Sequence, residues 1–167
     1  DGKQVTNQGS VTPDTSDYKY FENILDINTS YNDVYLFTQF EYSDPPIYGI
    51  DHEGLNYIYL EYTRNRLDIK AGEIFSIFGR GSAFSTFYDQ NIDFYNSIRG
   101  LEVQYDLTDW LKIFSLFGNG TYEYRTNPAA LISDREIDHE AVLAGLEIYS
   151  DLLGNIGAIY LEQDQEL

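Results

Sequence analysis

Two short triplets contain both histidines of the chain, and their residue types could bind a metal ion or transfer protons. They are Asp51-His52-Glu53 and Asp138-His139-Glu140. Histidine beside carboxylates can ligate zinc or act as a general base, whereas the same residues at a solvated loop end do no chemistry. Both interpretations stay open on the sequence alone, and the second is the simpler. The candidate metal ligands are His52, Glu53, His139 and Glu140.

Oxygen-bearing side chains at Asp89, Asn91 and Asp93 have the D-x-N-x-D spacing that opens a calcium-binding loop. The pattern does not continue as an EF-hand, because Phe94 stands where that loop needs glycine and Gly100 stands where it needs glutamate. A looser Ca²⁺ site built from acidic loop oxygens is the hypothesis that remains. No other cofactor is expected.

Two arginines, Arg80 and Arg99, bracket the same acidic stretch. If both side chains point inward, they could clamp Asp89 and Asp93 and fold the stretch into the lumen of a channel, where it would narrow the pore. In the alternative, both arginines pair at the surface, where an ion pair contributes about 0–1 kcal/mol. These four residues are therefore candidates for a constriction.

No arrangement in the sequence predicts a catalytic site. The glycine-rich spots around Gly79 and Gly118 are not followed by the Lys-Ser/Thr of a phosphate-binding loop. No Ser–His–Asp order stands out, and 28 acidic residues make carboxylate pairs too common to identify a glycosidase. A hydrolase that uses His52 or His139 is an alternative, but the prediction is that the chain is not an enzyme.

Composition excludes several classes of protein. The net charge of −18 disfavours nucleic-acid binding, which requires clustered lysine and arginine. No cysteine is present, so disulfides and thiolate metal sites are excluded. No apolar run approaches the roughly 18 residues of a membrane-spanning helix, although a membrane-spanning strand needs only about 10 alternating residues. Aromatic residues reach 16%, a content typical of membrane interfaces or sugar-binding surfaces.

The beginning of the chain, Asp1 to Asp17, is polar and rich in Gly, Pro, Ser and Thr, which predicts a flexible leader. The chain contains no methionine, begins without a signal segment and ends in an acidic stretch rather than an aromatic closing strand. We therefore expect a section of a longer protein, in which residues 18–167 form the folded part.

Period-two alternation of apolar and polar residues predicts eight antiparallel strands in the remaining chain. At 33–42, for example, Val34, Leu36 and Phe40 share one face. The connections alternate between short turns and long loops, a rhythm typical of up-and-down barrels. The predicted strands are 18–28, 33–42, 55–63, 67–78, 97–106, 110–124, 139–149 and 156–162.

Three features favour strands in a membrane over a soluble β-sandwich or jelly roll. The apolar face is filled mainly by Leu, Ile, Val and Ala. Aromatic residues lie near predicted strand ends, at Tyr42, Phe78, Trp110 and Tyr149, as a membrane-interface girdle requires. The opposite face carries single charges and glycines in mid-strand, at Glu61, Lys70, Gly72, Glu102, Lys112, Gly145 and Glu147.

Residues 67–117 add a resemblance to these patterns. The stretch contains Gly72-Glu73, then Phe78-Gly79-Arg80-Gly81, then an aromatic and acidic loop, and then Arg99-Gly100. In this order it resembles the largely uncharacterised outer-membrane barrel proteins of Bacteroidota-type bacteria. The resemblance implies a barrel larger than this chain, and it implies no enzyme activity.

Taken together, the sequence predicts an all-β, antiparallel up-and-down meander of about eight strands that forms part of a transmembrane β-barrel. The expected location is the bacterial outer membrane, with the lipid bilayer and an unknown small solute as partners and no nucleic acid. The expected role is that of a porin-like channel or a surface-exposed barrel. The alternative is a soluble, secreted β-sandwich that uses its tyrosines to stack on sugar rings.

Overall fold

The computed structural model describes residues 2–11, 21–44, 53–89, 94–124, 135–152 and 154–165. These residues are almost entirely β-strand, with one 3-10 turn. Among them, no helix is long and apolar enough to cross a membrane. The elements are β1 (Gly2–Val11), β2 (Phe21–Tyr31), β3 (Val34–Ser43), β4 (Glu53–Arg64), β5 (Leu67–Ile74), β6 (Ile77–Phe78), η1 (Gly79–Gly81), β7 (Phe84–Ser85), β8 (Phe87–Asp89), β9 (Phe94–Thr108), β10 (Leu111–Tyr124), β11 (Arg135–Ser150) and β12 (Gly154–Gln165).

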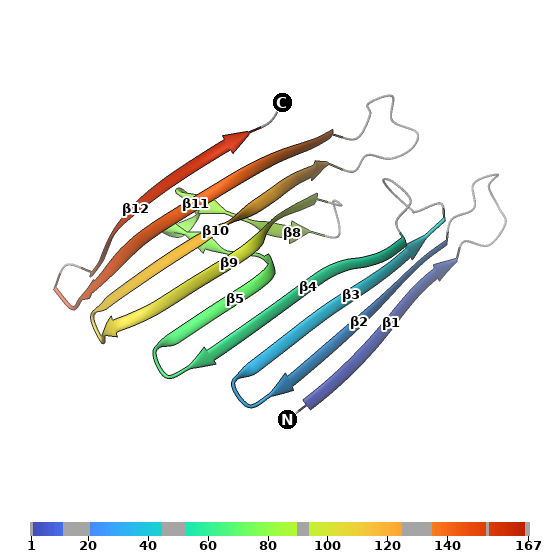
Figure 1. Ribbon diagram of the computed structural model, residues 1–167, viewed down its shortest axis with the longest axis horizontal. Coiled ribbons are helices and arrows are strands. Elements are labelled where there is room, and N and C mark those ends of the chain that lie inside the picture. Colours follow the sequence, from blue (N-terminus) through green and yellow to red (C-terminus); the bar gives the residue numbers. More distant parts are fainter. Residues whose placement is uncertain are drawn as a thin grey trace.

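One antiparallel sheet contains ten of these strands, in the order β1-β2-β3-β4-β5-β9-β10-β11-β12, with β8 paired to β9 beside this path (Figure 1). The two short strands β6 and β7 pair only with each other. The predicted antiparallel meander is confirmed, since all eight expected strands are present in the expected order. The described sheet is open, because β1 and β12 lie at opposite edges (Figure 1).

Tight turns join the strands at one end of the sheet (Figure 1), and the strand ends that the longer connections join lie at the opposite end. Two residues suffice for the turns Asn32-Asp33, Asn65-Arg66 and Asp109-Trp110. Asn32 and Asn65 have positive φ angles of 50° and 55°, a conformation that asparagine tolerates better than most residues. The predicted rhythm of short and long connections is therefore confirmed.

Two stretches differ from the prediction. Gly2–Val11, assigned above to a flexible leader, forms β1 and pairs with β2 from Gly2 opposite Ser30 to Val11 opposite Phe21. Main-chain pairing with a neighbouring strand needs no apolar side chains, so hydrophobicity gave no signal for it. The predicted strand 67–78 ends at Ile74, after which the chain leaves the sheet.

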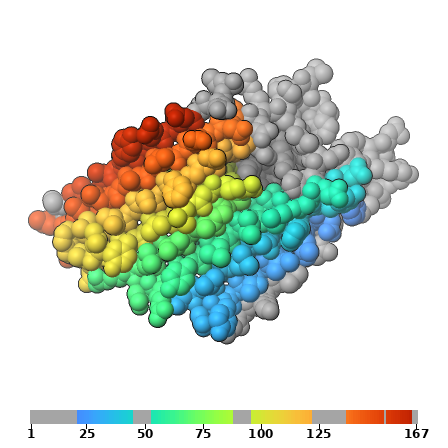
Figure 2. Space-filling model, in the orientation of Figure 1, coloured from blue at the N-terminus to red at the C-terminus, as the bar shows by residue number. Residues whose placement is uncertain are grey.

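The two faces of the sheet have opposite character. The outward face, defined by Leu101 and Val103 of β9, exposes large apolar side chains from β2 to β12. Figure 2 views the sheet in the orientation of Figure 1, and there the coloured strands form one continuous surface that no described segment crosses. The exposed apolar residues of the outward face are Phe21, Tyr31, Val34, Phe40, Tyr42, Leu55, Ile58, Leu60, Tyr105, Leu107, Ile113, Phe117, Val142, Leu146, Ile156 and Tyr160.

The inward face, defined by Glu102 of β9, is partly covered by residues 75–89. We call this stretch the inward segment; it contains β6, η1, β7 and β8, and it returns to the sheet where β8 pairs with β9. A small apolar core lies between the inward segment and strands β9 to β11. Its members are Ile74, Phe78, Phe84, Ile98, Phe114, Leu116, Ala141 and Leu143.

Candidate functional site

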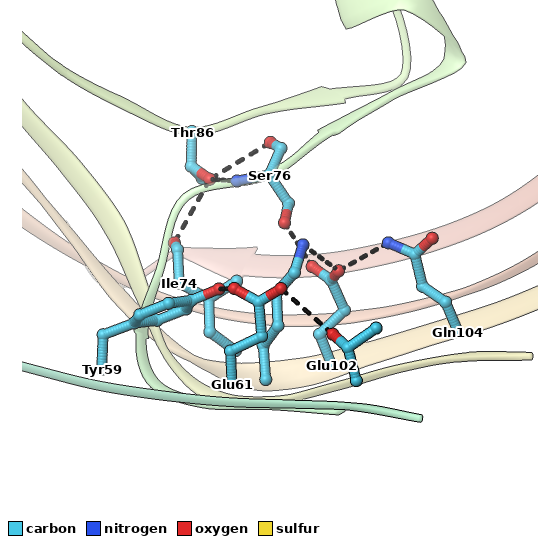
Figure 3. A network of polar contacts seen from close by, with 9 residues as sticks. Tyr59, Glu61, Ile74, Ser76, Thr86, Glu102 and Gln104 are labelled. Carbon is cyan, nitrogen blue, oxygen red and sulfur yellow. Dashed lines mark hydrogen bonds and ion pairs between the residues drawn. The ribbon is translucent and has the colours of Figure 1, made fainter. Parts of the chain in front are cut away.

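The most densely hydrogen-bonded polar group of the inward face is centred on Glu102, whose side chain is only 1% exposed. Lys70 lies directly opposite it on β5, and its Nζ is 3.0 Å from Glu102 Oε1. Gln104 Nε2 donates to the same oxygen at 2.7 Å. The Ser76 hydroxyl, from the inward segment, donates to Glu102 Oε2 (Figure 3). Three donors therefore hold a buried carboxylate, and one of them belongs to the inward segment.

The two arms of the inward segment are also tied to each other, through Ser76 and Thr86 (Figure 3). The Ser76 N–H donates to Thr86 Oγ1 at 2.8 Å, and the Thr86 N–H donates to the Ser76 carbonyl oxygen at 3.0 Å. Both residues are buried. Because these main-chain groups find partners within the protein, the segment can stay on the sheet away from water.

Further polar groups continue across the inward face on β2 to β4. Tyr59 Oη donates to Glu61 Oε2 at 2.5 Å, beside the Glu102 group (Figure 3). Farther along, Gln39 Nε2 donates to Asp26 Oδ1 at 2.7 Å, and Asn56 Nδ2 donates to Glu41 Oε2 at 2.7 Å. Acidic groups predominate among the described charged residues of this face: they are Glu22, Asp26, Glu41, Glu61, Asp68, Glu102, Asp106 and Glu147, beside the cations of Lys70 and Lys112.

Glycines make room for rings on the inward face. A Cβ at Gly120 would stand 2.5 Å from His139 Cε1, and a Cβ at Gly145 would stand 2.5 Å from Phe114 Cζ. The imidazole of His139 therefore lies over β10, and the ring of Phe114 lies over β11. Phe114 in turn stacks on Phe78 of the inward segment, with ring centroids 4.8 Å apart and planes inclined by 14°.

Of the predicted metal ligands, the structure describes Glu53, His139 and Glu140. His139 is buried on the inward face of β11, whereas Glu140, the next residue of the strand, is exposed on the outward face. One metal ion cannot bind both side chains across the sheet, so His139 and Glu140 do not share a site in the described strand, and the wider metal hypothesis stays a prediction. Glu53 begins β4, and His52 lies outside the described residues. Within the described ranges, no group of three or more His, Asp or Glu is placed to hold a metal ion.

The calcium hypothesis falls largely outside the described part of the chain. Asp89 ends β8, where it pairs with Phe94 of β9. Asn91 and Asp93 lie between the described ranges. The looser Ca²⁺ site therefore stays a prediction.

The predicted arginine clamp is wrong in its geometry. Arg99 lies on the outward face of β9, where its Nε and Nη2 each lie 2.5 Å from Glu73 Oε1. Ser97 Oγ donates to the other Glu73 oxygen at 2.6 Å. Arg80 lies in η1 of the inward segment, exposed and with a φ of 58°. The two arginines therefore lie on opposite sides of the sheet, and Lys70 and Ser76 make the polar contacts on the inward face instead.

The sequence contained a partial signal for the Glu102 group. Lys70 and Glu102 stand out as single charges in the middle of alternating strands, on the face opposite the aliphatic residues. Their pairing depends on the register between β5 and β9, which are separated in sequence by the whole inward segment. No local pattern identified Ser76 or Thr86.

Comparisons with known proteins give one match. The search of curated proteins and the search of solved structures both find no match, whereas the scan against family models does. A family model described as "Family of unknown function (DUF6029)" matches residues 5–166, which is nearly the whole chain. The chain therefore belongs to the DUF6029 family, whose function is unknown.

Proposed function

We propose that the chain is a section of a bacterial outer-membrane β-barrel, of the porin-like or surface-exposed type and without a catalytic role. The observation that carries the proposal is a contrast between the two faces of the sheet: large apolar side chains are exposed on the outward face, and the carboxylates of Glu41 and Glu102 are buried on the inward face. In a water-soluble protein the reverse arrangement is the rule. A large contiguous apolar surface marks a site of contact with a partner, and we propose that this partner is lipid.

The outward face suits hydrocarbon for a second reason. The main-chain N–H and C=O groups of the sheet are hydrogen-bonded between neighbouring strands from β1 to β12. Strands in lipid must satisfy these groups within the sheet, because hydrocarbon offers no partner. The side chains in its middle are mainly aliphatic, such as Ile58, Leu60, Ile113, Val142 and Leu146. An exposed Trp110 lies at the turn end, in keeping with an interfacial girdle.

The inward face suits the wall of a water-filled lumen. Charged and amide side chains lie across it in hydrogen-bonded groups, from Asp26 on β2 to Glu102 on β9. Tight turns at one end of the sheet (Figure 1), with the longer connections joining strand ends at the opposite end, match the periplasmic and outer ends of such barrels. The resemblance to Bacteroidota-type barrels agrees with this proposal. The partners would be the lipid bilayer and a small solute.

The decisive experiment compares two neighbouring residues of β10 that face opposite sides, Ile113 and Lys112. Because the chain has no cysteine, single variants Ile113→Cys and Lys112→Cys can each carry one nitroxide label after reconstitution into phospholipid vesicles. We expect the label at 113 to collide mainly with oxygen dissolved in lipid. The label at 112 should collide mainly with a water-soluble nickel complex.

The alternative function, a soluble module that binds sugars, has one observation in its favour. Four tyrosines are exposed on the outward face, at Tyr31, Tyr42, Tyr105 and Tyr160, and tyrosine rings stack on sugars. This alternative predicts a monodisperse, β-rich monomer in detergent-free buffer. In that event the nickel complex would reach the label at 113 as readily as the label at 112, and the membrane proposal would be abandoned.

A further inference from the structure

We infer that the inward segment, residues 75–89, is a fixed constriction of the lumen that exposes the apolar side chains of Ile77 and Phe87. It would favour solutes with an apolar part over hydrated ions. This inference rests on the proposed function, because a constriction requires a lumen. The inference is based on two observations: how the segment is attached to the sheet, and which side chains it exposes on the side away from the sheet.

The attachment of the segment is polar at one point. Ser76 donates to the buried carboxylate of Glu102, and Thr86 closes the segment on itself through two hydrogen bonds to the Ser76 main chain. Releasing the segment would break the hydrogen bond from Ser76 to Glu102 and expose the ring of Phe78 to water, and both changes are costly. A segment held in this way behaves as part of the wall and not as a mobile lid.

The attachment is apolar at a second point. Phe78 stacks on Phe114, and Phe84 lies beside Phe78 with centroids 6.3 Å apart. A Cβ at Gly79 would stand 3.2 Å from Ile159 Cδ1, so the segment also approaches β12. The aromatic contacts and the polar contacts lie on the same side of the segment, the side that faces the sheet.

The segment also exposes apolar side chains, next to the exposed Arg80 and Ser82. In the short β6–β7 hairpin, Phe78 is opposite Phe84 and faces the sheet, so its neighbour Ile77, opposite Ser85, faces away. Ile77 is 64% exposed and Phe87 is 46% exposed. Apolar side chains on the free side of a polar-lined passage resist wetting, which hinders hydrated ions more than solutes with an apolar part.

Single-channel recording in planar bilayers tests this inference on the full protein. The variant Ile77→Ser/Phe87→Ser should raise ion conductance at least about twofold, because the constriction becomes polar and wider. The matched control is Ile113→Ser/Phe117→Ser, an isoleucine–phenylalanine pair exposed on the outward face. That control should leave the conductance unchanged. A wild-type protein that does not conduct, beside a variant that does, would equally support the inference.

The outcomes separate the two proposals. Channels whose conductance is the same in wild type and in Ile77→Ser/Phe87→Ser would overturn the constriction and leave the barrel intact. If wild type and every variant fail to conduct, the channel itself is overturned, and the constriction falls with it.

Hydrogen exchange tests the attachment without any need for conductance. The Ser76 and Thr86 amides donate within the protein, so we expect them to exchange about as slowly as the amides of the β9–β10 ladder. Phe78→Ala, which removes the ring stacked on Phe114, should accelerate their exchange selectively. Fast exchange of both amides in the wild-type protein would show that the segment is not fixed and would overturn the inference.

Discussion

Strands β5 and β9 are joined by two ion pairs of similar chemistry, one on each face of the sheet. Lys70 is directly opposite Glu102 on the inward face, and Glu73 is directly opposite Arg99 on the outward face. The separations are 3.0 Å and 2.5 Å. Both carboxylates are buried, with Glu102 1% and Glu73 4% exposed, but their cations differ, because Lys70 is 19% exposed whereas the Arg99 side chain is 72% exposed.

The difference shows how burial changes the role of an ion pair. A buried carboxylate needs several donors, because water cannot replace a missing one. Glu102 therefore draws on Lys70, Gln104 and Ser76, and the last of these fastens the inward segment to the sheet. Glu73 is buried as well, but its cation is exposed, so water can take the place of the Arg99 guanidinium and this contact fixes little beyond β5 and β9, which the backbone already joins.

The largest expected loss of stability follows from changing Lys70 in the inward ion pair, Lys70–Glu102. Lys70→Met removes the cation and leaves Glu102 charged and buried, which should lower the free energy of unfolding by about 3–5 kcal/mol. Denaturant titration in the detergent that keeps the protein folded would measure it. The double variant Lys70→Met/Glu102→Gln is the control: it removes both charges and should recover most of the loss. A loss below about 1 kcal/mol for Lys70→Met would mean that water reaches Glu102.

The second prediction concerns the ring contact that accompanies the inward pair. Gly145→Val places side-chain atoms where the Phe114 ring lies, because even a Cβ would stand 2.5 Å from Cζ. Overpacking of this kind should lower the free energy of unfolding by about 1–3 kcal/mol. Ala144→Val is the matched control, since Ala144 is exposed on the outward face of the same strand, and its effect should stay within about 0.5 kcal/mol. Equal effects at the two positions would contradict the packing described here.

Local rules predicted much of the fold from the sequence. Alternation and turn chemistry act over a few residues, so they located eight strands and the tight turns at Asn32 and Asn65. They missed β1, whose pairing with β2 depends on main-chain hydrogen bonds rather than on apolar residues. They also missed the end of β5 at Ile74, because the apolar run through Phe78 continues from the sheet into the inward segment without a break.

The candidate site was predicted less well. The alternation of side chains along a strand could, however, have corrected two of its predictions. In the predicted strand 97–106, Leu101 and Glu102 fall on opposite faces, which already assigns Arg99 to the face of Leu101. The same rule separates His139 from Glu140. The contact of Ser76 with Glu102 could not be predicted, because it depends on how the inward segment folds over a sheet that itself forms from distant strands.

The smallest expected effect is that of Arg99→Ala in the outward pair. Glu73 is itself only 4% exposed, but it keeps the hydrogen bond from Ser97, and water can enter where the largely exposed guanidinium stood, so the screened loss should be only about 0–1 kcal/mol. A double-mutant cycle with Glu73→Gln would isolate the pair, and its coupling energy should be several-fold smaller than that of Lys70 with Glu102. Channel conductance should also be unchanged, because Arg99 does not lie on the inward face. Coupling as large as that of the inward pair would instead mean that the outward face is dry as far as Glu73. In that case the apolar surroundings proposed for Ile113 and Val142 extend to the end of β5.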